Sequence, residues 1–267
     1  MRVGIVQMTS DDDLAANLKK ARELVGRAAA LGAELVALPE NFAYLRREGM
    51  PYPCAQGLDG PIVETLRELA RTYGIWLLGG TFPETAGDAS RVHNSSLLLS
   101  PTAEIAAHYR KIHLFDVDLG HTGGGAYRES DSIAPGAEIV VASTPFGPLG
   151  LSICYDLRFP ELYREMATRG ARFIAVPSAF MPQTGKDHWE VLLRARAIEN
   201  QAFVLAPAQY GAHSPDRSSY GRSLVVDPWG IVIAQAPDGP GVIVADCDLE
   251  AQDRVRAAIP ALRNRRL

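Results

Sequence analysis

The sequence predicts an α/β fold in which two β-sheets stack face to face and helices cover both outer faces, a four-layer α-β-β-α sandwich. Strand-like runs that are apolar throughout alternate with amphipathic helical runs, which indicates sheets covered by helices. Other strand-like runs follow one another with no helix between them, which indicates antiparallel additions and a second stacked sheet. A doubly wound single sheet is the alternative.

The first half of the chain has clear signals for where helices begin and end. Ser10 and three aspartates precede an Ala/Leu-rich run with apolar residues at helical spacing, and Gly32 ends it. A second helix has Pro61 in its first turn and Gly74 as its stop. The predicted order is strand 2–9, the helix ending at Gly32, strand 34–39, helix 61–73, and strands 75–82, 92–99 and 104–112.

The second half repeats the alternation of strands and helices, although no residue-level repeat is visible. The predicted order is strand 149–153, helix 161–169, strand 173–177, helix 187–200, and strands 203–208, 223–226, 231–234 and 242–245. No linker or shift in composition separates the two halves. We therefore expect residues 1–267 to form a single domain.

Composition excludes several classes of function. The chain is 47% hydrophobic and 22% charged, with a formal net charge of -4, which is typical of a soluble globular protein. It has no Lys/Arg stripe of the kind that binds nucleic acid. It has neither an apolar run near the ~18 residues of a membrane span nor a leader-like N-terminus, so we expect a cytoplasmic protein that does not bind membranes.

Several common cofactor and hydrolase motifs are missing from the sequence. There is no GxGxxG, GxxxxGK[ST], GxSxG, HExxH or CxxC, so neither a nucleotide cofactor nor a common zinc site is expected. His113, Asp116, Asp118 and His121 lie close together in the sequence, but a hydrogen-bonded polar loop is favoured there over a metal site. The glycine cluster 123–125 likewise predicts a turn between strands.

Cys154 is the first candidate for chemistry. It follows the strand-like run 149–153 and precedes a predicted helix, so we expect it at a sheet edge where backbone N–H groups favour a thiolate. The alternative is a small buried hydrophobic residue, as most free cysteines are. Cys54 and Cys247 are interpreted as packing residues.

Two further charged residues stand at predicted strand ends. Glu40 ends one apolar strand and Lys111 ends another, so all three side chains would emerge together if these strands lie beside the strand of Cys154. Taken singly, Glu40 could cap a loop and Lys111 could be a solvated charge. A cysteine nucleophile needs a base and a group that stabilises an oxyanion, and these two residues could supply both.

Four ordered sequence blocks together resemble the nitrilase superfamily of carbon-nitrogen hydrolases. The similarity extends from VGIVQM near the N-terminus to SLVVDPWG near the C-terminus. The four blocks are ALPEN (37–41), YRKIHLFD (109–116), YRESDSIAPG (127–136) and GLSICYDLRFPELYR (150–164).

The resemblance implies an amidase with a Glu-Lys-Cys triad and no cofactor. Glu40 would be the general base, and Cys154 would form a thioester acyl-enzyme. Lys111 and the backbone N–H of Tyr155 would stabilise the oxyanion, while Glu129 would orient Lys111 and the substrate. A lysine between two carboxylates should also stay protonated.

Within the superfamily the chain is most similar to the Nit branch, whose members hydrolyse the amide of deaminated glutathione to 2-oxoglutarate and cysteinylglycine. The alternatives are an omega-amidase acting on 2-oxoglutaramate and an N-carbamoyl amino acid amidohydrolase, while a nitrile substrate is disfavoured. Candidates for holding an anionic keto-acid amide are Arg158, Phe180, Thr184 and Gln209, although each could have a purely structural role. Loops 120–126 and 212–218 depart from the pattern expected of Nit proteins, and both are expected to border the substrate.

A non-catalytic scaffold of the same fold is the alternative of another class. The intact set of Glu40, Lys111, Glu129 and Cys154 argues against it. The resemblance also implies a homodimer or higher homo-oligomer. Residues 250–267 carry too few apolar residues for an independent core element, so we expect them to pack across a two-fold interface.

Overall fold

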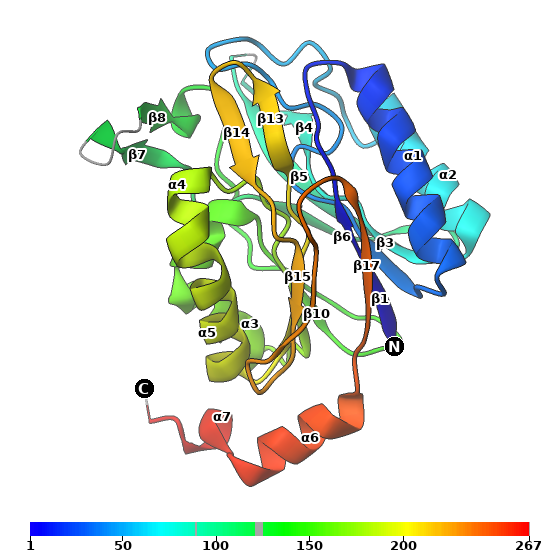
Figure 1. Cartoon of the computed structure of the whole chain (residues 1–267), viewed down its shortest axis with the longest axis vertical. Helices are drawn as coiled ribbons and strands as arrows, with labels where there is room; N and C mark the ends of the chain where they lie inside the picture. The colour runs from blue at the N-terminus through cyan, green and yellow to red at the C-terminus, as the bar shows by residue number, and fades with distance from the viewer. Residues whose placement is uncertain (89, 121–124, 267) are drawn as a thin grey trace.

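The computed structural model describes residues 1–88, 90–120 and 125–266. Two β-sheets stack against each other, with α1 and α2 on one outer face and α3 and α5 on the other (Figure 1). The predicted four-layer α-β-β-α sandwich is therefore confirmed, and the single doubly wound sheet is not found.

The first sheet has seven strands in the order β17-β1-β2-β3-β5-β4, with β6 beside β5. β1, β2 and β3 are parallel, whereas β17, β5, β4 and β6 add as antiparallel neighbours. The bounds are β1 Arg2–Gln7, β2 Leu35–Ala37, β3 Trp76–Leu78, β4 Phe82–Thr85, β5 Val92–Leu99, β6 Ile105–Arg110 and β17 Gly241–Asp246.

The second sheet has six strands in the order β16-β15-β12-β11-β10-β9. Its centre, β10 to β12, is parallel, and β9, β15 and β16 pair antiparallel at its sides. The bounds are β9 Val141–Ala142, β10 Leu149–Leu151, β11 Phe173–Ala175, β12 Phe203–Ala206, β15 Leu224–Val226 and β16 Val232–Gln235.

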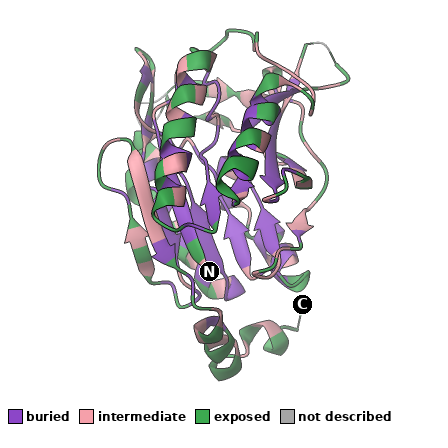
Figure 2. Cartoon of the chain, turned by 90° about the vertical axis from the view of Figure 1, so that its right-hand side faces the viewer, coloured by how far each residue is buried: buried purple, intermediate pink, exposed green. Residues whose placement is uncertain are grey.

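The helices begin and end where local sequence signals favour it. Asp13 accepts a hydrogen bond from Ala16 N at the start of α1, and Gly74 ends α2 in the left-handed region with φ 62°. The helices are α1 Leu14–Ala30, α2 Pro61–Tyr73, α3 Pro160–Thr168, α4 Pro182–Thr184, α5 Glu190–Asn200, α6 Leu249–Ala258 and α7 Ala261–Asn264. Figure 2 shows exposed outer helix faces over buried strands.

Strands of the first sheet are buried on both faces because they separate two hydrophobic clusters. In β1, Val3 and Ile5 face the cluster between the two sheets, whereas Val6 faces the cluster under α1 and α2. Leu35 and Val36 of β2 divide in the same way. This explains why these strands are apolar throughout rather than alternating.

The predicted strand 75–82 is wrong in one respect, because it is broken into two strands, β3 and β4, which pair one after the other with the same strand, β5. Gly80 adopts φ 53° there, and a Cβ on it would collide with the backbone carbonyl of Pro39. Only glycine fits this close approach to the segment that leads to Glu40.

Sequence patterns did not reveal two short hairpins, because their strands are polar and partly exposed. They are β7 Asp116–Asp118 with β8 Ala126–Arg128, and β13 Tyr210–Ser214 with β14 Arg217–Tyr220. The predicted helix 187–200 also differs, since α5 follows a π-helical turn, η4, over Gly185–Trp189. The described part of the chain also contains the 3-10 turns η2 Glu129–Asp131 and η3 Cys154–Arg158.

The C-terminal segment forms α6 and α7, which extend from the base of the sandwich (Figure 1). Gln252 fixes α6 to the same chain, because its buried amide donates to the backbone oxygens of Arg172 and Gln201 at 2.9 and 3.0 Å. Packing of this segment across a two-fold interface remains a prediction. Among the helices that the structure describes, none is long and apolar enough to cross a membrane.

Candidate active site

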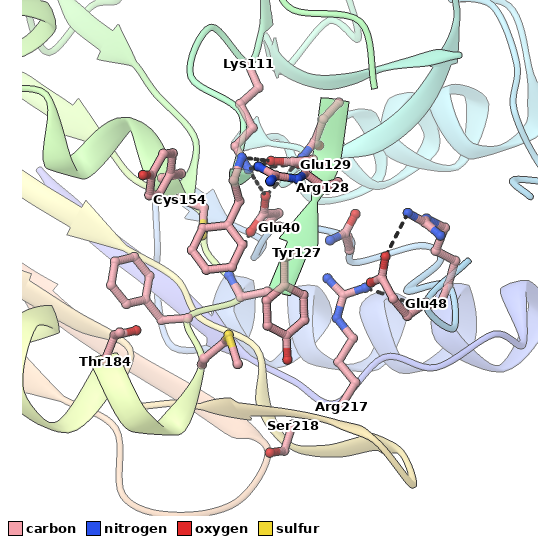
Figure 3. A pocket seen from close by; sticks show the side chains of 18 of the residues that line it. Glu40, Glu48, Lys111, Tyr127, Arg128, Glu129, Cys154, Thr184, Arg217 and Ser218 are labelled. Atoms are coloured by element: carbon pink, nitrogen blue, oxygen red, sulfur yellow. Dashed lines mark hydrogen bonds and ion pairs between the residues drawn. The ribbon is translucent and has the colours of Figure 1, made fainter. Parts of the chain in front are cut away.

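Three strand ends deliver Glu40, Lys111 and Cys154 to one place. Glu40 follows β2, Lys111 directly follows β6, and Cys154 opens η3 after β10. β2 and β6 are parallel and belong to the first sheet, whereas β10 belongs to the second. The strands of Glu40 and Lys111 therefore do not share a sheet with the strand of Cys154, and the residues meet where two stacked sheets end together (Figure 3).

Lys111 is a buried ammonium held between two carboxylates. Its Nζ lies 3.1 Å from Oε1 of Glu40 and 3.0 and 2.9 Å from the two carboxylate oxygens of Glu129. Burial alone would lower the pKa of Lys111, but the charges of Glu129 and Glu40 outweigh burial and raise its pKa well above the ordinary value. The lysine is thus a buried, fixed positive charge, as expected.

Glu40 is 3% exposed and positioned from several elements. Its Oε1 accepts from Asn94 Nδ2 at 2.9 Å, and its Oε2 accepts from the backbone N–H of Ala179 at 2.9 Å. The next residue, Asn41, has φ 56° and donates its N–H to Thr81 Oγ1 at 2.8 Å. The carboxylate is therefore fixed in orientation, as a proton acceptor in catalysis needs to be.

Cys154 lies on a strained turn with φ 46° and is 9% exposed. Burial first, and then the neighbouring Glu40 carboxylate, raise the pKa of its thiol well above the ordinary value, while Lys111 lowers it. The thiolate expected from the sequence is therefore wrong, because desolvation and Glu40 outweigh Lys111 and the nearby N–H groups. Cys154 is a thiol beside a carboxylate that can remove its proton.

A buried carboxylate fixes the turn that carries Cys154. Asp156 accepts from Ile153 N at 2.8 Å and from Tyr109 Oη at 2.7 Å through Oδ2, and from His113 N at 3.0 Å through Oδ1. Tyr155 is the second residue of η3, so its N–H belongs to the first turn, where helical N–H groups have no intrahelical acceptor. Such a group can bind an oxyanion formed at Cys154.

A cavity of about 340 Å³ opens over this cluster, within the usual range for a small-molecule site. Its walls come from the loop after β2, the β7-β8 hairpin, η3, the segment leading into α4, and the β13-β14 hairpin (Figure 3). The cavity is therefore assembled from both sheets and both hairpins.

Three of the four candidates for holding the substrate line this cavity: Arg158, Phe180 and Thr184. Arg158 lies 5.5 Å from the ring centre of Phe180 and 5.8 Å from that of Tyr155, and it contacts His188 Nδ1 at 3.3 Å. Its guanidinium forms no ion pair with any described carboxylate, so the purely structural alternative of an acidic partner finds no support.

Gln209 is the exception, and its proposed contact with substrate is wrong. It is fully buried and lies outside the cavity wall. Its Nε2 donates to the backbone oxygen of Glu40 at 2.9 Å and to Ser10 Oγ at 2.8 Å. Gln209 thus holds the backbone of Glu40 rather than a ligand.

Sequence reasoning missed several cavity residues, which are Arg46, Glu48, Tyr52, Asn94, Tyr127 and Arg128. Loop 212–218, which was expected to border the substrate, lines the cavity through its last three residues, Asp216, Arg217 and Ser218. In loop 120–126, the other loop expected to border the substrate, residues 121–124 lie outside the described part of the chain.

The suggested metal cluster includes His121, which also lies outside the described residues, as do Gly123 and Gly124. The described residues contain no group of three potential metal ligands. His113 Nδ1 instead contacts Asp156 Oδ1 at 2.7 Å, and Asp116 accepts from Ser130 N at 3.0 Å.

The two other cysteines lie outside the described cavity wall. Burial raises the pKa of the Cys54 thiol to about 11 and that of Cys247 to about 12. Both are therefore protonated at neutral pH, as packing residues would be.

Comparison with known proteins agrees with the geometry. The family model of carbon-nitrogen hydrolases matches residues 2–257. Proteins named deaminated glutathione amidase from Synechocystis sp. and Homo sapiens are 43% and 44% identical, over 97% and 99% of this chain and 96% and 82% of theirs.

A solved structure extends the comparison to three dimensions. Nit3 from Saccharomyces cerevisiae, a member of branch 10 of the nitrilase superfamily, matches with a TM-score of 0.89 and 33% identity over 100% of this chain and 97% of Nit3. With a family model spanning nearly all of its length and relatives above 40% identity, the chain belongs to the carbon-nitrogen hydrolase family.

Proposed function

We propose that this chain is a cysteine-dependent amidase that hydrolyses deaminated glutathione to 2-oxoglutarate and cysteinylglycine. One observation carries the mechanism: a protonated lysine lies between Glu40 and Glu129, beside a buried cysteine, in a cavity of small-molecule size. The names of the relatives favour this substrate among keto-acid amides.

In the first half of the proposed reaction, Sγ of Cys154 attacks the amide carbonyl carbon as Glu40 takes the thiol proton. The carbonyl oxygen gains the negative charge and is stabilised by Nζ of Lys111 and the N–H of Tyr155. Loss of one such donor typically costs ~3–4 kcal/mol of transition-state stabilisation. The C–N bond then breaks as Glu40 passes its proton to the leaving amine, which leaves a thioester on Cys154.

In the second half, Glu40 takes a proton from a water molecule as the water oxygen attacks the thioester carbonyl carbon. The same two donors stabilise the second oxyanion. The C–S bond then breaks, the thiolate regains the proton from Glu40, and the acid product leaves. The raised pKa of Cys154 suits this cycle, because the thiol returns to its neutral form once each turnover ends.

The acyl side of the substrate carries the keto-acid carboxylate, for which we propose Arg158 as the partner. Its guanidinium lies over Tyr155 and Phe180 at the cavity wall and is not used by a described carboxylate. Thr184 is the proposed hydroxyl partner on the same wall. Arginine suits this task because its planar donors match a carboxylate.

Product analysis by mass spectrometry tests this function. Wild type, Cys154→Ala and the control Cys54→Ala are each given deaminated glutathione, 2-oxoglutaramate and an N-carbamoyl amino acid. The proposal expects turnover of deaminated glutathione by wild type and Cys54→Ala but not by Cys154→Ala. Faster turnover of 2-oxoglutaramate or the N-carbamoyl amino acid would overturn the assignment of deaminated glutathione as the substrate. Equal turnover by wild type and Cys154→Ala would overturn the mechanism.

We also propose that the chain acts as one domain and pairs into a homodimer. Large apolar side chains are exposed together around α5 and the β15-β16 turn: Val191 is 67% exposed, Ile198 51%, Trp229 54% and Ile231 55%. A monomer seldom exposes such a patch without use. Light scattering should give twice the chain mass, and a monomer in wild type would contradict the pairing.

A further inference from the structure

One cationic group in the cavity has no part in the mechanism above. Arg217, at the start of β14, lines the cavity, and of its five N–H donors only Nη1 has a described acceptor, the backbone oxygen of Arg46 at 3.2 Å. It forms no ion pair with a described carboxylate. The remaining donors are therefore available to a ligand.

The hairpin that carries Arg217 is fixed to the body of the protein. His213 is buried, with Nδ1 2.7 Å from the backbone oxygen of Ser10 and Nε2 2.8 Å from Ser219 Oγ. Thr9 Oγ1 also donates to the backbone oxygen of Tyr210 at 2.6 Å. Arg217 thus stands on an anchored element, which a specific binding group requires.

The neighbouring charges do not neutralise Arg217. The guanidinium of Arg46 already has partners within the protein, because it donates to Met50 O at 3.1 Å and to Ser132 Oγ at 2.9 Å and stacks over Tyr52. Its Nη2 also lies 3.5 Å from Oε1 of Glu48. Outside the Cys154 cluster, the charged residues of the described cavity wall are four arginines and two acids, Arg46, Arg128, Arg158 and Arg217 against Glu48 and Asp216.

Arg217 lies on the side of the cavity where the leaving group of the substrate is expected. Figure 3 shows Thr184 on one side of the pocket and Arg217 with Glu48 on the other, with Tyr127 between them. Since Arg158 and Thr184 are proposed to hold the acyl side, the part of the substrate beyond the scissile nitrogen extends toward Arg217. Cysteinylglycine ends in a carboxylate, which an arginine can bind with two parallel hydrogen bonds.

We propose that Arg217 binds the carboxylate of the leaving amine, so that the cavity selects amides with an anionic group on each side of the scissile bond. This inference rests on the proposed function. The leaving group that this cavity would select is an amine of dipeptide size with a free C-terminal carboxylate. Ammonia, the leaving group of 2-oxoglutaramate, cannot use this contact.

The test compares deaminated glutathione with the same compound carrying a C-terminal carboxamide. A hydrogen-bonded charge pair contributes ~1.5–3 kcal/mol, so wild type should prefer the carboxylate by about 10- to 100-fold in kcat/KM. In Arg217→Gln this preference should fall to near one, and Arg217→Lys should retain part of it. Arg71→Gln on exposed α2, outside the described cavity wall, is the matched control and should keep the full preference.

The possible failures are distinguishable. If wild type shows no preference for the carboxylate, or Arg217→Gln keeps the wild-type preference, the contact is overturned while amidase activity stands. If wild type hydrolyses neither compound nor 2-oxoglutaramate, the proposed function fails and this contact falls with it. Because the readout is a ratio between two substrates, a partial loss of folded Arg217→Gln does not change it.

Discussion

The hydroxyl of Tyr109 donates a 2.7 Å hydrogen bond to Oδ2 of Asp156, and both residues are fully buried. Tyr109 lies two residues before Lys111 in the first sheet, and Asp156 lies two residues after Cys154 beyond the second. Together with the 3.0 Å bond from His113 N to Oδ1, this contact ties the lysine-bearing segment to the cysteine-bearing turn. These contacts help to fix the spacing of Lys111 and Cys154 across the interface between the sheets.

Tyr109→Phe removes this contact and leaves a buried carboxylate one donor short. Because a hydrogen bond to a charged group contributes ~1.5–3 kcal/mol, the free energy of unfolding should fall by that amount and kcat should fall as well. Urea unfolding and kcat together provide the measurement. Tyr163→Phe is the control. Loss of the Tyr163 hydroxyl, which lies 2.8 Å from Ser152 Oγ, should lower the free energy of unfolding with little loss of kcat.

Glu40→Gln should speed the alkylation of Cys154 and slow turnover. The Glu40 charge raises the pKa of Cys154, so its removal lowers that pKa and should speed alkylation by iodoacetamide at mildly alkaline pH. Turnover should nevertheless fall by ~10²–10⁴-fold, because the general base is gone. Peptide mass spectrometry of Cys154 gives the alkylation rate, with Cys54 in the same sample as reference. Slower alkylation in the variant would contradict the assignment.

Glu129→Gln removes one of the two carboxylates that keep Lys111 protonated. The pKa of Lys111, which Glu129 helps to raise against the effect of burial, should therefore fall. Turnover needs the charged lysine, so the alkaline limb of the pH profile of kcat/KM should move to lower pH. An alkaline limb that stays in place would show that Lys111 does not set it.

His213 predicts a loss of stability in mild acid. Burial lowers its pKa from 6.5 to about 4, so below pH 6.5 the unfolded chain binds a proton that the folded chain does not. The free energy of unfolding should fall between pH ~6.5 and ~4, by up to about 3 kcal/mol in total. Urea unfolding at pH 7.5, 6.5 and 5.5 measures the slope, and it should flatten in His213→Gln. An unchanged slope in that variant would rule His213 out as its source.

Sequence patterns predicted the sandwich well because its strands and helices have strong local signals. Helix 61–73 agrees with α2 at both ends, since Pro61 and Gly74 restrict the backbone there. The prediction of one strand over 75–82 was wrong at Gly80. This glycine has a positive φ and closely approaches Pro39, which is distant in the sequence. The hairpins β7-β8 and β13-β14 were missed because their strands are short and polar.

The candidate site was predictable to a similar extent. Glu40, Lys111, Glu129 and Cys154 were identified because each lies in a sequence block that carries the resemblance to the family. They meet because the two stacked sheets end together there. Gln209 was misplaced because sequence alone does not tell whether a polar side chain at a strand end faces the cavity or the backbone of Glu40. The protonation of Cys154 depends on burial and on Glu40, and neither can be weighed before the fold is known.

The proposed mechanism requires turnover to pass through a thioester on Cys154. This intermediate can be detected by acid quenching during turnover of deaminated glutathione, followed by peptide mass spectrometry. A 2-oxoglutaryl adduct on the Cys154 peptide, removable by hydroxylamine and absent from Cys154→Ala, is the predicted result. Steady turnover with no adduct on Cys154, together with full activity of Cys154→Ala, would contradict it.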